Sequence, residues 1–341
     1  MTSIPTTMRA IEAHSTNFDD LTLSTLPTPQ PQAGEILVRV KAASINYRDI
    51  VLVKGFYKPD IKFPFVPLSD ASGEVAAIGP GVTRFRVGDH VVPTFIQGWP
   101  NGLPIPERRA NWTLGWPRTG VLQEYIVVPA DDAVLKPASL SHIEAATLPI
   151  AALTAWSALT RGGIKGGDWV LVEGTGGVSI FALQFAKSMG AKVIVLTSSE
   201  DKMQRVRSLG SDSAVNYKQV PEWSGVVRDM TGGHGIDIVV ETAGSTLPQA
   251  LKAMSFGGYV GIVGFLGGFE VPMPIVPLIE SMLRIEGIAV GSRGQFEAMN
   301  RAIEAAGIKP VIDRVLALAD AKEAFKLMER GGHFGKIVIE L

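Results

Sequence analysis

The sequence contains no cysteine among its 341 residues. This absence excludes disulfide bonds, thiolate nucleophiles, iron–sulfur clusters and every zinc site that has a cysteine ligand. An excess of charge of either sign is also missing, because 32 Lys and Arg residues stand against 33 Asp and Glu residues, which gives a formal net charge of −1. Proteins that grip nucleic acid normally carry a concentrated positive face. We therefore expect no nucleic-acid partner.

Long apolar runs are lacking as well. No segment approaches the roughly 18 to 20 unbroken apolar residues of a membrane span, and residues 1–8 lack the basic-then-apolar order of a signal peptide. What is present suits a large core, since 46% of the residues are hydrophobic and only 19% are charged. We expect a globular cytoplasmic protein that has no membrane partner.

Histidine is scarce, and its spacing does not suggest a metal centre. The five histidines are His14, His90, His142, His234 and His333. No two of them have the i, i+4 spacing that places a ligand pair on one helix face. The sequence therefore predicts no bound metal.

The first half of the chain is predicted to be rich in short strands. Residues 35–42 alternate apolar and polar side chains, and residues 73–81 and 88–93 repeat the pattern between glycine and proline turns. Residues 98–120 hold four prolines and three tryptophans, which predicts a long loop without a regular element. That loop is either a functional lid or interface arm, or a packed tryptophan cover over the core.

From Trp169 onward, short apolar runs alternate with helical patterns. Strands are expected at residues 169–173, 192–197, 214–217, 236–241 and 259–264, with helices over 178–189 and 200–209 between the first three. Strands that alternate with helices pair in parallel through right-handed crossovers, so the sequence predicts a doubly wound α/β sheet. The last fifty residues predict helices at 295–306 and 319–329 and strands at 311–316 and 336–340, and we expect them to return to the first domain.

A glycine cluster, Gly174-Thr175-Gly176-Gly177-Val178-Ser179, lies between the first of these strands and the helix after it. Glycine permits a tight turn and lets the backbone approach a pyrophosphate, whose charge is held by amides at the helix N-terminus. Ser179 replaces the third glycine of the fingerprint, and it is small enough for close helix packing. The cluster predicts a dinucleotide site.

The end of the second strand reads Thr197-Ser198-Ser199 and has no acidic residue. A carboxylate at this point would bind both ribose hydroxyls of NAD and repel a 2′-phosphate. Hydroxyl groups accommodate that phosphate and Lys202 can neutralise it, so we predict NADPH as the cofactor. The structural alternative is that Ser198 caps the following helix, with Asp201 completing a capping box.

Several motifs together indicate a family. They are Ala42-Ala43-Ser44-Ile45-Asn46-Tyr47-Arg48-Asp49, the glycine-punctuated segments Gly73-Glu74-Val75 and Gly88-Asp89-His90-Val91, Leu153-Thr154-Ala155-Trp156, and Gly335-Lys336-Ile337-Val338. Over nearly its full length the chain resembles the medium-chain dehydrogenase/reductase superfamily, in the style of its zinc-independent quinone oxidoreductase (zeta-crystallin-like) branch. The resemblance implies a GroES-like catalytic domain over residues 1–151 and 291–341. A Rossmann nucleotide-binding domain would occupy residues 152–290.

The same resemblance implies where the cofactor is held. Thr154, Gly264, Phe265 and Val290 would lie at the nicotinamide side and Gly176, Gly177 and Val178 at the pyrophosphate, while Ser198 and Lys202 would contact the 2′-phosphate and Tyr217 the adenosine. Lys336 is either another phosphate contact or plain surface charge.

Departures from the zinc-dependent members are informative. Asn46 stands where those enzymes have a cysteine ligand, and Leu68-Ser69-Asp70 replaces their Gly-His-Glu segment. Zinc stabilises an alkoxide as a Lewis acid, so an enzyme without it needs a substrate that spreads the developing charge. We therefore predict a metal-free oxidoreductase that transfers hydride from NADPH to a conjugated acceptor such as a quinone.

Asn46 is the first candidate to face the acceptor oxygen, because an amide donates a hydrogen bond without titrating. Tyr47 and Tyr57 are weaker candidates for a proton donor, and Asp49 is expected to anchor Arg48 or a backbone amide. For each candidate the alternative is a turn or packing role.

Other readings remain open. A 2-alkenal or enoyl reductase is the main alternative activity, because substrate choice lies in loops such as residues 98–120. A non-catalytic NADPH-binding protein and a Rossmann methyltransferase are further alternatives. By analogy with the family we expect a homodimer that acts on a small-molecule substrate, with the apolar run at residues 271–278 at the interface.

Overall fold

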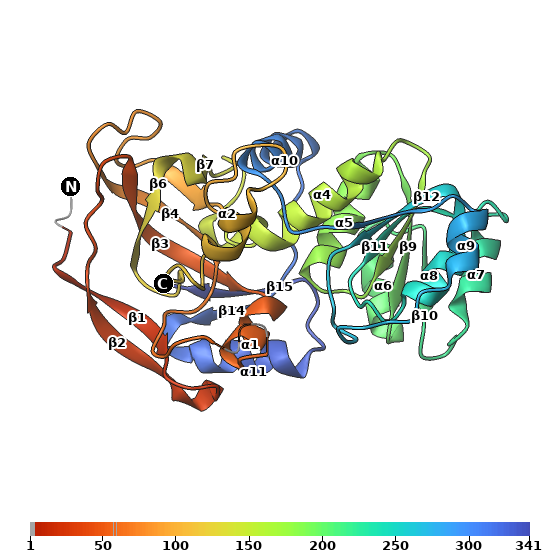
Figure 1. Ribbon diagram of the computed structural model, residues 1–341, viewed down its shortest axis with the longest axis horizontal. Coiled ribbons are helices and arrows are strands. Elements are labelled where there is room, and N and C mark those ends of the chain that lie inside the picture. The colour runs from red at the N-terminus through yellow and green to blue at the C-terminus, as the bar shows by residue number, and fades with distance from the viewer. Residues whose placement is uncertain (1–3, 57, 59) are drawn as a thin grey trace. The chain divides into compact units, whose positions relative to one another are not determined.

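Two large sheets of different kinds organise the chain in this computed structural model, which describes residues 4–56, 58 and 60–341. The chain divides into unit 1, formed by Met1–Ile150 with Ser292–Leu341, and unit 2, formed by Ala151–Gly291. Each unit has its own sheet and its own buried apolar cluster. Figure 1 labels most of the elements of both.

Unit 1 is built mainly from antiparallel strands. Its elements are β1 (Thr7–Ala13), β2 (Leu21–Pro27), β3 (Glu35–Ile45), α1 (Tyr47–Val53), β4 (Asp70–Ile78), β5 (His90–Pro93), α2 (Pro106–Asn111), β6 (Tyr125–Pro129), β7 (Ala133–Leu135), α3 (His142–Ala145), α10 (Arg293–Ala306), β14 (Ile312–Ala317), α11 (Ala321–Arg330) and β15 (Lys336–Glu340). The strand order of the larger sheet is β14-β15-β3-β4-β5-β7, and β6 also pairs with β3, whereas β1 and β2 form a separate pair. The C-terminal strand β15 lies antiparallel to β3, with Ile337 opposite Ile45.

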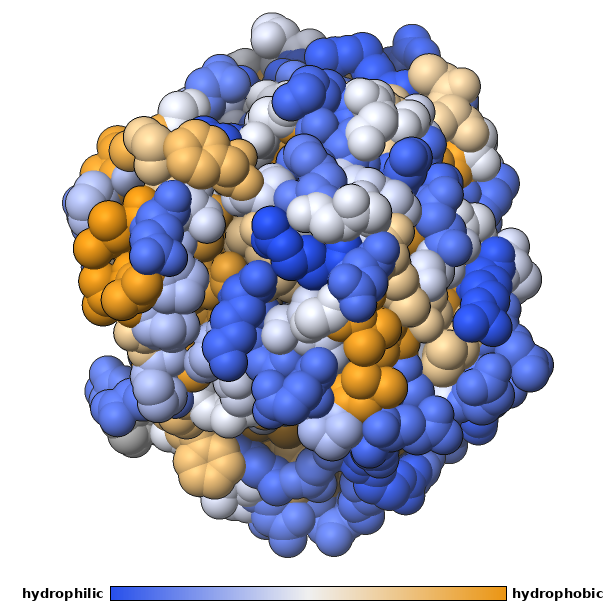
Figure 2. All heavy atoms as spheres, turned by 90° about the vertical axis from the view of Figure 1, so that its right-hand side faces the viewer, coloured by the Kyte–Doolittle hydropathy of each residue, from blue (hydrophilic) through white to orange (hydrophobic). Residues whose placement is uncertain are grey.

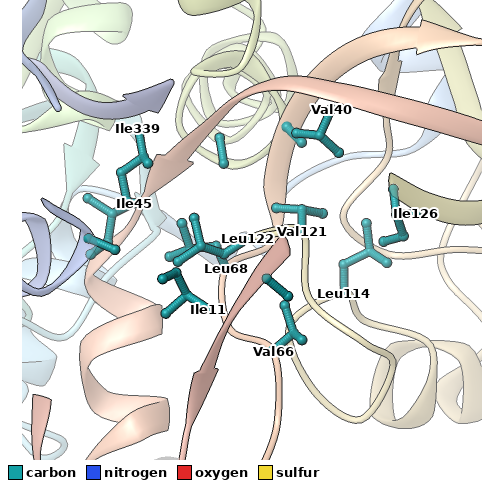
Figure 3. Close-up of a cluster of buried hydrophobic side chains, with 14 of the residues drawn as sticks. Ile11, Val40, Ile45, Val66, Leu68, Leu114, Val121, Leu122, Ile126 and Ile339 are labelled. Atoms are coloured by element: carbon teal, nitrogen blue, oxygen red, sulfur yellow. The ribbon is translucent and has the colours of Figure 1, made fainter. Parts of the chain in front are cut away.

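The core of unit 1 gathers side chains from segments that are far apart in the sequence. Figure 3 shows Ile11, Ile45, Leu68, Val121 and Ile339 among the apolar side chains that fill it. Ile45 and Ile339 belong to neighbouring strands, while Leu68 and Val121 come from the irregular segments before β4 and β6. Burial of this apolar surface stabilises the unit and fixes the chain on both sides of Asn46.

Leu68 has a backbone conformation that favours glycine. Its φ is +67°, in the left-handed region, and its side chain is fully buried. A non-glycine residue in that region costs roughly 1 to 3 kcal/mol and persists where the surroundings over-determine it. Here the carbonyl oxygen of Leu68 accepts the amide of Val121 at 3.0 Å, and the side chain lies in the core cluster. The strain directly precedes Ser69 and Asp70.

Unit 2 is a doubly wound parallel sheet. Its elements are α4 (Leu153–Gly162), β8 (Trp169–Glu173), α5 (Gly177–Ser188), β9 (Lys192–Thr197), α6 (Glu200–Ser208), β10 (Ser213–Asn216), α7 (Trp223–Met230), β11 (Ile236–Glu241), α8 (Leu247–Ala253), β12 (Met254–Ile262), α9 (Ile275–Glu280) and β13 (Arg284–Gly287). The strand order is β10-β9-β8-β11-β12-β13, and all the pairings are parallel. The direction of the strand order reverses between β8 and β11, which is where such sheets bind ligands.

Successive side chains of the central strands point to opposite faces of this sheet, and helices pack against both faces. Helices α4 and α5 contact β8, β9, β11 and β12, whereas Leu171 packs in the cluster that contains residues of α7 and α8. A strand that is buried on both faces has a continuous apolar run in its sequence. The bounds predicted from such runs, residues 169–173, 192–197 and 236–241, are the bounds of β8, β9 and β11 in the structure. The predicted α/β class, which combines a doubly wound parallel sheet with a β-rich domain, is confirmed.

The proline-rich segment at residues 98–120 differs from the prediction. It was expected to contain no regular element, but it contains α2, whose first residue is Pro106. Proline is compatible with the first helical turn, because its missing amide hydrogen would have no partner there. Trp99 is buried and Trp116 packs against the unit 1 core, which agrees with the tryptophan-cover interpretation.

Among the described residues, no helix combines the length and the apolar character that a membrane crossing requires.

Candidate active site

The carboxyl ends of the parallel strands bring most of the predicted cofactor residues to one edge of unit 2. The glycine turn follows β8, Ser198 follows β9, Tyr217 follows β10, Gly264 and Phe265 follow β12, and Val290 follows β13. Parallel strands end at the same edge of a sheet, and ligands bind there. Thr154 is buried in the first turn of α4.

The turn after β8 is shaped for a negatively charged group. Gly174 has φ +75°, which permits the tight turn, and Gly176 is the N-cap residue of α5. No side chain caps this helix, and a Cβ on Gly176 would meet nothing within 4 Å. First-turn amides have no partner inside a helix and attract anions. Ser179 donates its hydroxyl hydrogen to the Glu173 carbonyl at 2.6 Å and so ties α5 to β8.

The end of β9 shows which serine caps the next helix. Ser199, rather than Ser198, is the N-cap residue of α6, and its Oγ accepts the backbone amide of Lys202 at 3.3 Å. The predicted capping role of Ser198 is therefore wrong, because α6 begins at Glu200, one residue later than that role requires. Ser198 is half-buried, and Tyr217 lies alongside because its amide donates to the Thr197 carbonyl at 3.0 Å.

Two buried carboxyl groups lie at the point where the strand order reverses. Thr246 Oγ1 is 3.0 Å from Glu173 Oε2 and 2.8 Å from Glu241 Oε1, which also accepts the amides of Ala243 and Gly244. Burial, together with the negative charge of Glu241, holds the pKa of Glu173 well above its usual range. A protonated Glu173 limits the negative charge at the edge where an anionic dinucleotide would bind.

Close backbone packing and strain mark the far end of this edge. A Cβ on Gly264 would lie 2.4 Å from the Thr242 carbonyl oxygen, so this position leaves no room for a side chain. Phe265 stacks on Phe269 with ring centroids 5.3 Å apart. Val290 has φ +80°, which is a genuine outlier for a β-branched residue. Such strain is typical of positions that hold a ligand.

Unit 1 contributes a buried charged cluster around Asn46, the N-cap residue of α1. The ammonium group of Lys336 donates to Asn46 Oδ1 at 2.6 Å and to the Ile45 carbonyl at 2.8 Å. Lys336 is only 3% exposed, so its interpretation as surface charge is wrong. The antiparallel register of β15 and β3 explains the contact, because it places Lys336 beside the end of β3.

Two carboxyl groups accompany this lysine. Asp49 accepts the backbone amide of Asn46 at 2.8 Å and lies 3.7 Å from the Arg48 guanidinium, so it anchors both groups as predicted. Asp70 is fully buried and accepts the amide of Ile150 at 3.1 Å. Burial raises the pKa of Asp70 to about 7, although the positive charge of Lys336 opposes the shift. Burial likewise lowers the pKa of Lys336, against the charges of Asp70 and Asp49.

The tyrosine candidates differ in what the structure shows. Tyr47 is the first residue of α1, adjacent to Asn46, and is 37% exposed. Tyr57 lies outside the described residues. Arg48 donates to the Trp116 carbonyl at 3.1 Å and thereby ties the segment at residues 98–120 to α1.

Comparison with known proteins identifies the family. Residues 32–138 match the alcohol dehydrogenase GroES-like domain, and residues 177–305 match the zinc-binding dehydrogenase family. A zinc-type alcohol dehydrogenase-like protein of Schizosaccharomyces pombe is 39% identical over 95% of this chain and 96% of its own length. The chain belongs to the medium-chain dehydrogenase/reductase superfamily.

Solved structures of this superfamily match over nearly the whole chain. A candidate alcohol dehydrogenase of Sinorhizobium meliloti 1021 is 42% identical, with a TM-score of 0.93 and coverage of 99% of this chain and 100% of the other. An NAD-dependent alcohol dehydrogenase is 36% identical, with a TM-score of 0.88 and coverage of 98% and 100%. The protein is therefore an alcohol dehydrogenase-like oxidoreductase with a GroES-like domain, and its family uses a nicotinamide cofactor.

Zinc, the metal of many members of the superfamily, does not fit the residues of unit 1. Asn46 Oδ1 is occupied by the ammonium group of Lys336, and Ser69 Oγ lies 3.4 Å from Asp49. A cation already fills the neighbourhood, and a neutral amide and a hydroxyl are poor substitutes for thiolate and imidazole ligands. In the part of the chain that the structure describes, no three metal-ligating side chains gather. His90 and His142 do meet, with nitrogen atoms 2.7 Å apart.

Sequence reasoning missed the partnership of Lys336 with Asn46 and the pairing of Glu173 with Glu241. One signal was available for the first: a lysine at the start of an otherwise apolar strand needs a partner if that strand is buried on both faces. No local sequence pattern predicts the pairing of Glu173 with Glu241, because the two residues are 68 positions apart and only the strand order makes them neighbours.

Proposed function

We propose that the protein is an NADPH-dependent, zinc-independent reductase that transfers hydride to a conjugated acceptor such as a quinone. The observation that carries this proposal is the hydrogen bond from the Lys336 ammonium group to Asn46, the residue that the family resemblance sets in place of a cysteine ligand of the zinc-dependent enzymes. Reduction of a simple carbonyl builds a localised alkoxide, whereas a quinone or enone delocalises the charge over its conjugated system. Quinones and enones therefore suit a site that can stabilise negative charge only through hydrogen bonds and one buried cation.

The cofactor site fits a dinucleotide. The uncapped amides at the start of α5 and the open space above Gly176 would hold the pyrophosphate, and the edge formed by Thr154, Gly264, Phe265 and Val290 would hold the nicotinamide. When bound, the nicotinamide supplies the hydride. Asn46 would orient the acceptor through its amide hydrogens, and the hydroxyl of Tyr47 is the described group that would supply a proton to the reduced acceptor.

Preference for NADPH follows from the end of β9. Ser198 and Lys202 offer a hydroxyl and a cation there, and the strand ends without a carboxylate that would repel the 2′-phosphate. The NAD-dependent relative found among the solved structures represents the alternative, so both cofactors belong in the test.

The test is oxidation of NADPH and NADH by chelator-treated protein in the presence of 1,4-quinones, enals, enones and simple aldehydes. We expect turnover of the conjugated acceptors with NADPH and no stimulation by added zinc. Turnover of enals or enones in place of quinones would move the proposal to the 2-alkenal or enoyl reductases. Recovery of simple aldehyde reduction on adding zinc would overturn it, as would NADPH binding without turnover of any acceptor.

We also propose that the protein is a homodimer through unit 2. The segment that precedes its end strand β13 carries exposed apolar side chains, in α9 and on both sides of it: Phe269, Ile275, Val276, Ile279 and Met282. Figure 2, which faces the end of the molecule that carries α9, shows hydrophobic side chains gathered at one side of the view. Exposed patches of this kind commonly mark interfaces. Light scattering at micromolar concentration should give twice the 36.4 kDa chain mass, and a monomeric mass would contradict the proposal.

A further inference from the structure

Two glutamates at the carboxyl ends of β8 and β11 form a buried pair inside unit 2. Glu173 is the last residue of β8 and Glu241 is the last residue of β11, and both are buried. The two strands are neighbours in the parallel sheet. Leu171 and Val239, two residues earlier in each strand, pack in the cluster with α7 and α8. Because side chains two residues apart share a face of a strand, both glutamates point to the face that α7 and α8 cover.

One oxygen of each carboxyl group receives donors from the chain. Glu241 Oε1 accepts the backbone amides of Ala243 at 3.0 Å and Gly244 at 2.7 Å. Glu173 Oε2 accepts the backbone amide of Thr242 at 3.3 Å. The hydroxyl of Thr246 lies between these two carboxylate oxygens, at 2.8 Å and 3.0 Å. A hydroxyl has a single hydrogen, so Thr246 donates to only one of the two glutamates at a time.

The second oxygen of each carboxyl group shows that the pair holds a proton. Glu173 Oε1 and Glu241 Oε2 are buried and receive no donor from the described residues, yet the two carboxyl groups are hydrogen-bonded to each other. Two ionised carboxylates offer acceptors only, so this contact requires a proton on one of them. Two amides reach Glu241 and one reaches Glu173, which favours Glu241 as the ionised member. Burial and the charge of Glu241 hold the pKa of Glu173 well above its usual range, in agreement with a proton on Glu173.

The groups around the pair are uncharged or distant from it. On the neighbouring strands, Leu196 of β9 lies opposite Glu173 and Ile262 of β12 lies opposite Glu241. The turn after β11, residues 242–246, contains no charged residue. The charged side chains of α7 and α8 are exposed: Arg228, Asp229 and Lys252. A proton, rather than a cation of these elements, therefore balances the second negative charge.

The pair adjoins both sides of the proposed cofactor edge. Glu173 directly precedes the glycine turn that would hold the pyrophosphate. Glu241 holds the amide of Ala243, and the carbonyl of Ala243 accepts the amide of Gly267 at 2.7 Å. Gly264 packs against the same turn so closely that it has no room for a side chain. The carboxylate of Glu241 thus fixes the turn after β11, and this turn supports the segment after β12.

We infer that Glu173 and Glu241 are positioning residues that share one proton, and that this proton keeps the turn after β11 in the form that binds the dinucleotide. The inference rests on the proposed cofactor site and adds a dependence of binding on pH. Loss of the proton to solvent would leave two negative charges side by side in an apolar interior, beside the place for an anionic pyrophosphate. Such an arrangement is costly, so the carboxylates would separate and release the amides of the turn.

Glu173→Gln tests the shared proton without any ligand. The Gln amide donates to Glu241 as the protonated carboxyl would, but it does not titrate. The raised pKa of Glu173 means that the folded protein holds a proton that the unfolded chain has lost at neutral pH. The stability that this proton contributes is present below the unfolded pKa and is lost as the pH rises through the folded pKa. We therefore expect the wild type to release one more proton on unfolding than Glu173→Gln, from the pH slopes of urea unfolding between about pH 6 and pH 8.

Glu222→Gln is the matched control for this comparison. Glu222 is exposed at the start of α7, and its side chain makes no capping hydrogen bond there. The variant removes one carboxyl group from the same unit, and its slope should equal that of the wild type. Equal slopes for the wild type and Glu173→Gln would overturn the shared proton.

The second arm measures NADPH binding by fluorescence titration. Relative to its own value near pH 7, the Kd of the wild type should rise at least tenfold by about pH 10, whereas the Kd of Glu173→Gln should rise much less. Groups that both proteins share, such as Lys202, cancel in this comparison. Glu241→Gln also leaves a single carboxyl group in the pair, so it should flatten the profile in the same way.

A further variant separates the acceptor role of Glu241 from its charge. Glu241→Ala removes the oxygen that holds the turn, and it should weaken NADPH binding about tenfold at every pH, the size expected for loss of one hydrogen bond to a charged group. Glu241→Gln keeps that oxygen and should recover most of the affinity. Equal weakening by the two variants would contradict the positioning role. If Glu241→Ala does not fold, the profiles of Glu173→Gln and Glu241→Gln still decide the inference.

The two arms fail separately. If the protein binds no dinucleotide but the unfolding slopes differ by one proton, the proposed cofactor site fails and the shared proton stands. If NADPH binds and the slopes are equal, the inference is overturned while the cofactor site survives. A difference of one proton with identical binding profiles would overturn the part of the proton in binding.

Discussion

The glycine turn of unit 2 and the buried cluster around Asn46 in unit 1 differ in the chemical groups that form them. In unit 2 the anion-binding groups are backbone amides at the start of α5, and Gly176 contributes by the absence of a side chain. In unit 1 the groups are the side chains of Asn46, Asp70 and Lys336, which belong to the N-cap of α1, to β4 and to β15. The first arrangement is local in sequence, whereas the second is assembled over 290 residues.

This difference decides how each site responds to change. A binding site formed by backbone amides tolerates many substitutions of neighbouring side chains. It is blocked when a large side chain replaces the glycine that leaves the space open. A site made of buried charges depends on the ionisation of each member, because an uncompensated charge in a low-dielectric interior is costly. The glycine turn should therefore be sensitive to shape, and the Asn46 cluster to pH.

Gly176→Val should produce the largest effect. A Cβ at this position meets no protein atom within 4 Å, so the free protein accommodates the change, but the branched side chain would fill the space for the pyrophosphate. We expect the Kd for NADPH to rise about 100-fold, equivalent to about 2.8 kcal/mol, in fluorescence titrations. Gly225→Val is the matched control, because Gly225 in α7 also faces open space. Equal weakening by both variants would show that the turn has no special role.

Asp70→Asn should change the pH dependence of stability. The pKa of Asp70 is about 7 in the folded protein against 3.8 normally, so the folded state holds a proton that the unfolded state has lost between those values. Its contribution to stability is present below about pH 4 and is lost as the pH rises through about 7. We expect the variant to gain on the order of 1 to 2 kcal/mol relative to wild type between pH 4.5 and 7.5 in urea unfolding. Parallel curves for the two proteins would contradict this assignment.

Ser198 and Ser199 should separate cofactor choice from helix capping. Ser199→Ala removes the cap of α6 and should cost about 1 kcal/mol of stability while the ratio of NADPH to NADH affinity stays constant. Ser198→Ala should lower that ratio severalfold with little change in Tm. The reverse assignment of the two effects would place the phosphate contact at Ser199.

Prediction from the sequence succeeded where the signal was local. The buried strands at residues 169–173 and 192–197 are unbroken apolar runs in the sequence, and the helix predicted over residues 178–189 agrees within one residue at each end with α5, Gly177–Ser188. It failed at Pro106, where proline was taken to prevent a helix that it in fact begins. It also failed at Lys336, for which a phosphate contact and surface charge were the two alternatives and the buried contact with Asn46 was not foreseen. In both cases the residue type was weighed without its position in the element or its partners across the sheet.

The sequence by itself determined the parallel sheet, the glycine turn and the lack of cysteine ligands, because hydrophobic periodicity and residue identity act over a few neighbouring positions. Only the tertiary structure decided that Lys336 holds Asn46, that Glu173 lies beside Glu241, and that Ser199 rather than Ser198 caps α6. The first two depend on strand order and register across long separations. The third depends on a shift of one residue in where a helix begins, which composition does not encode.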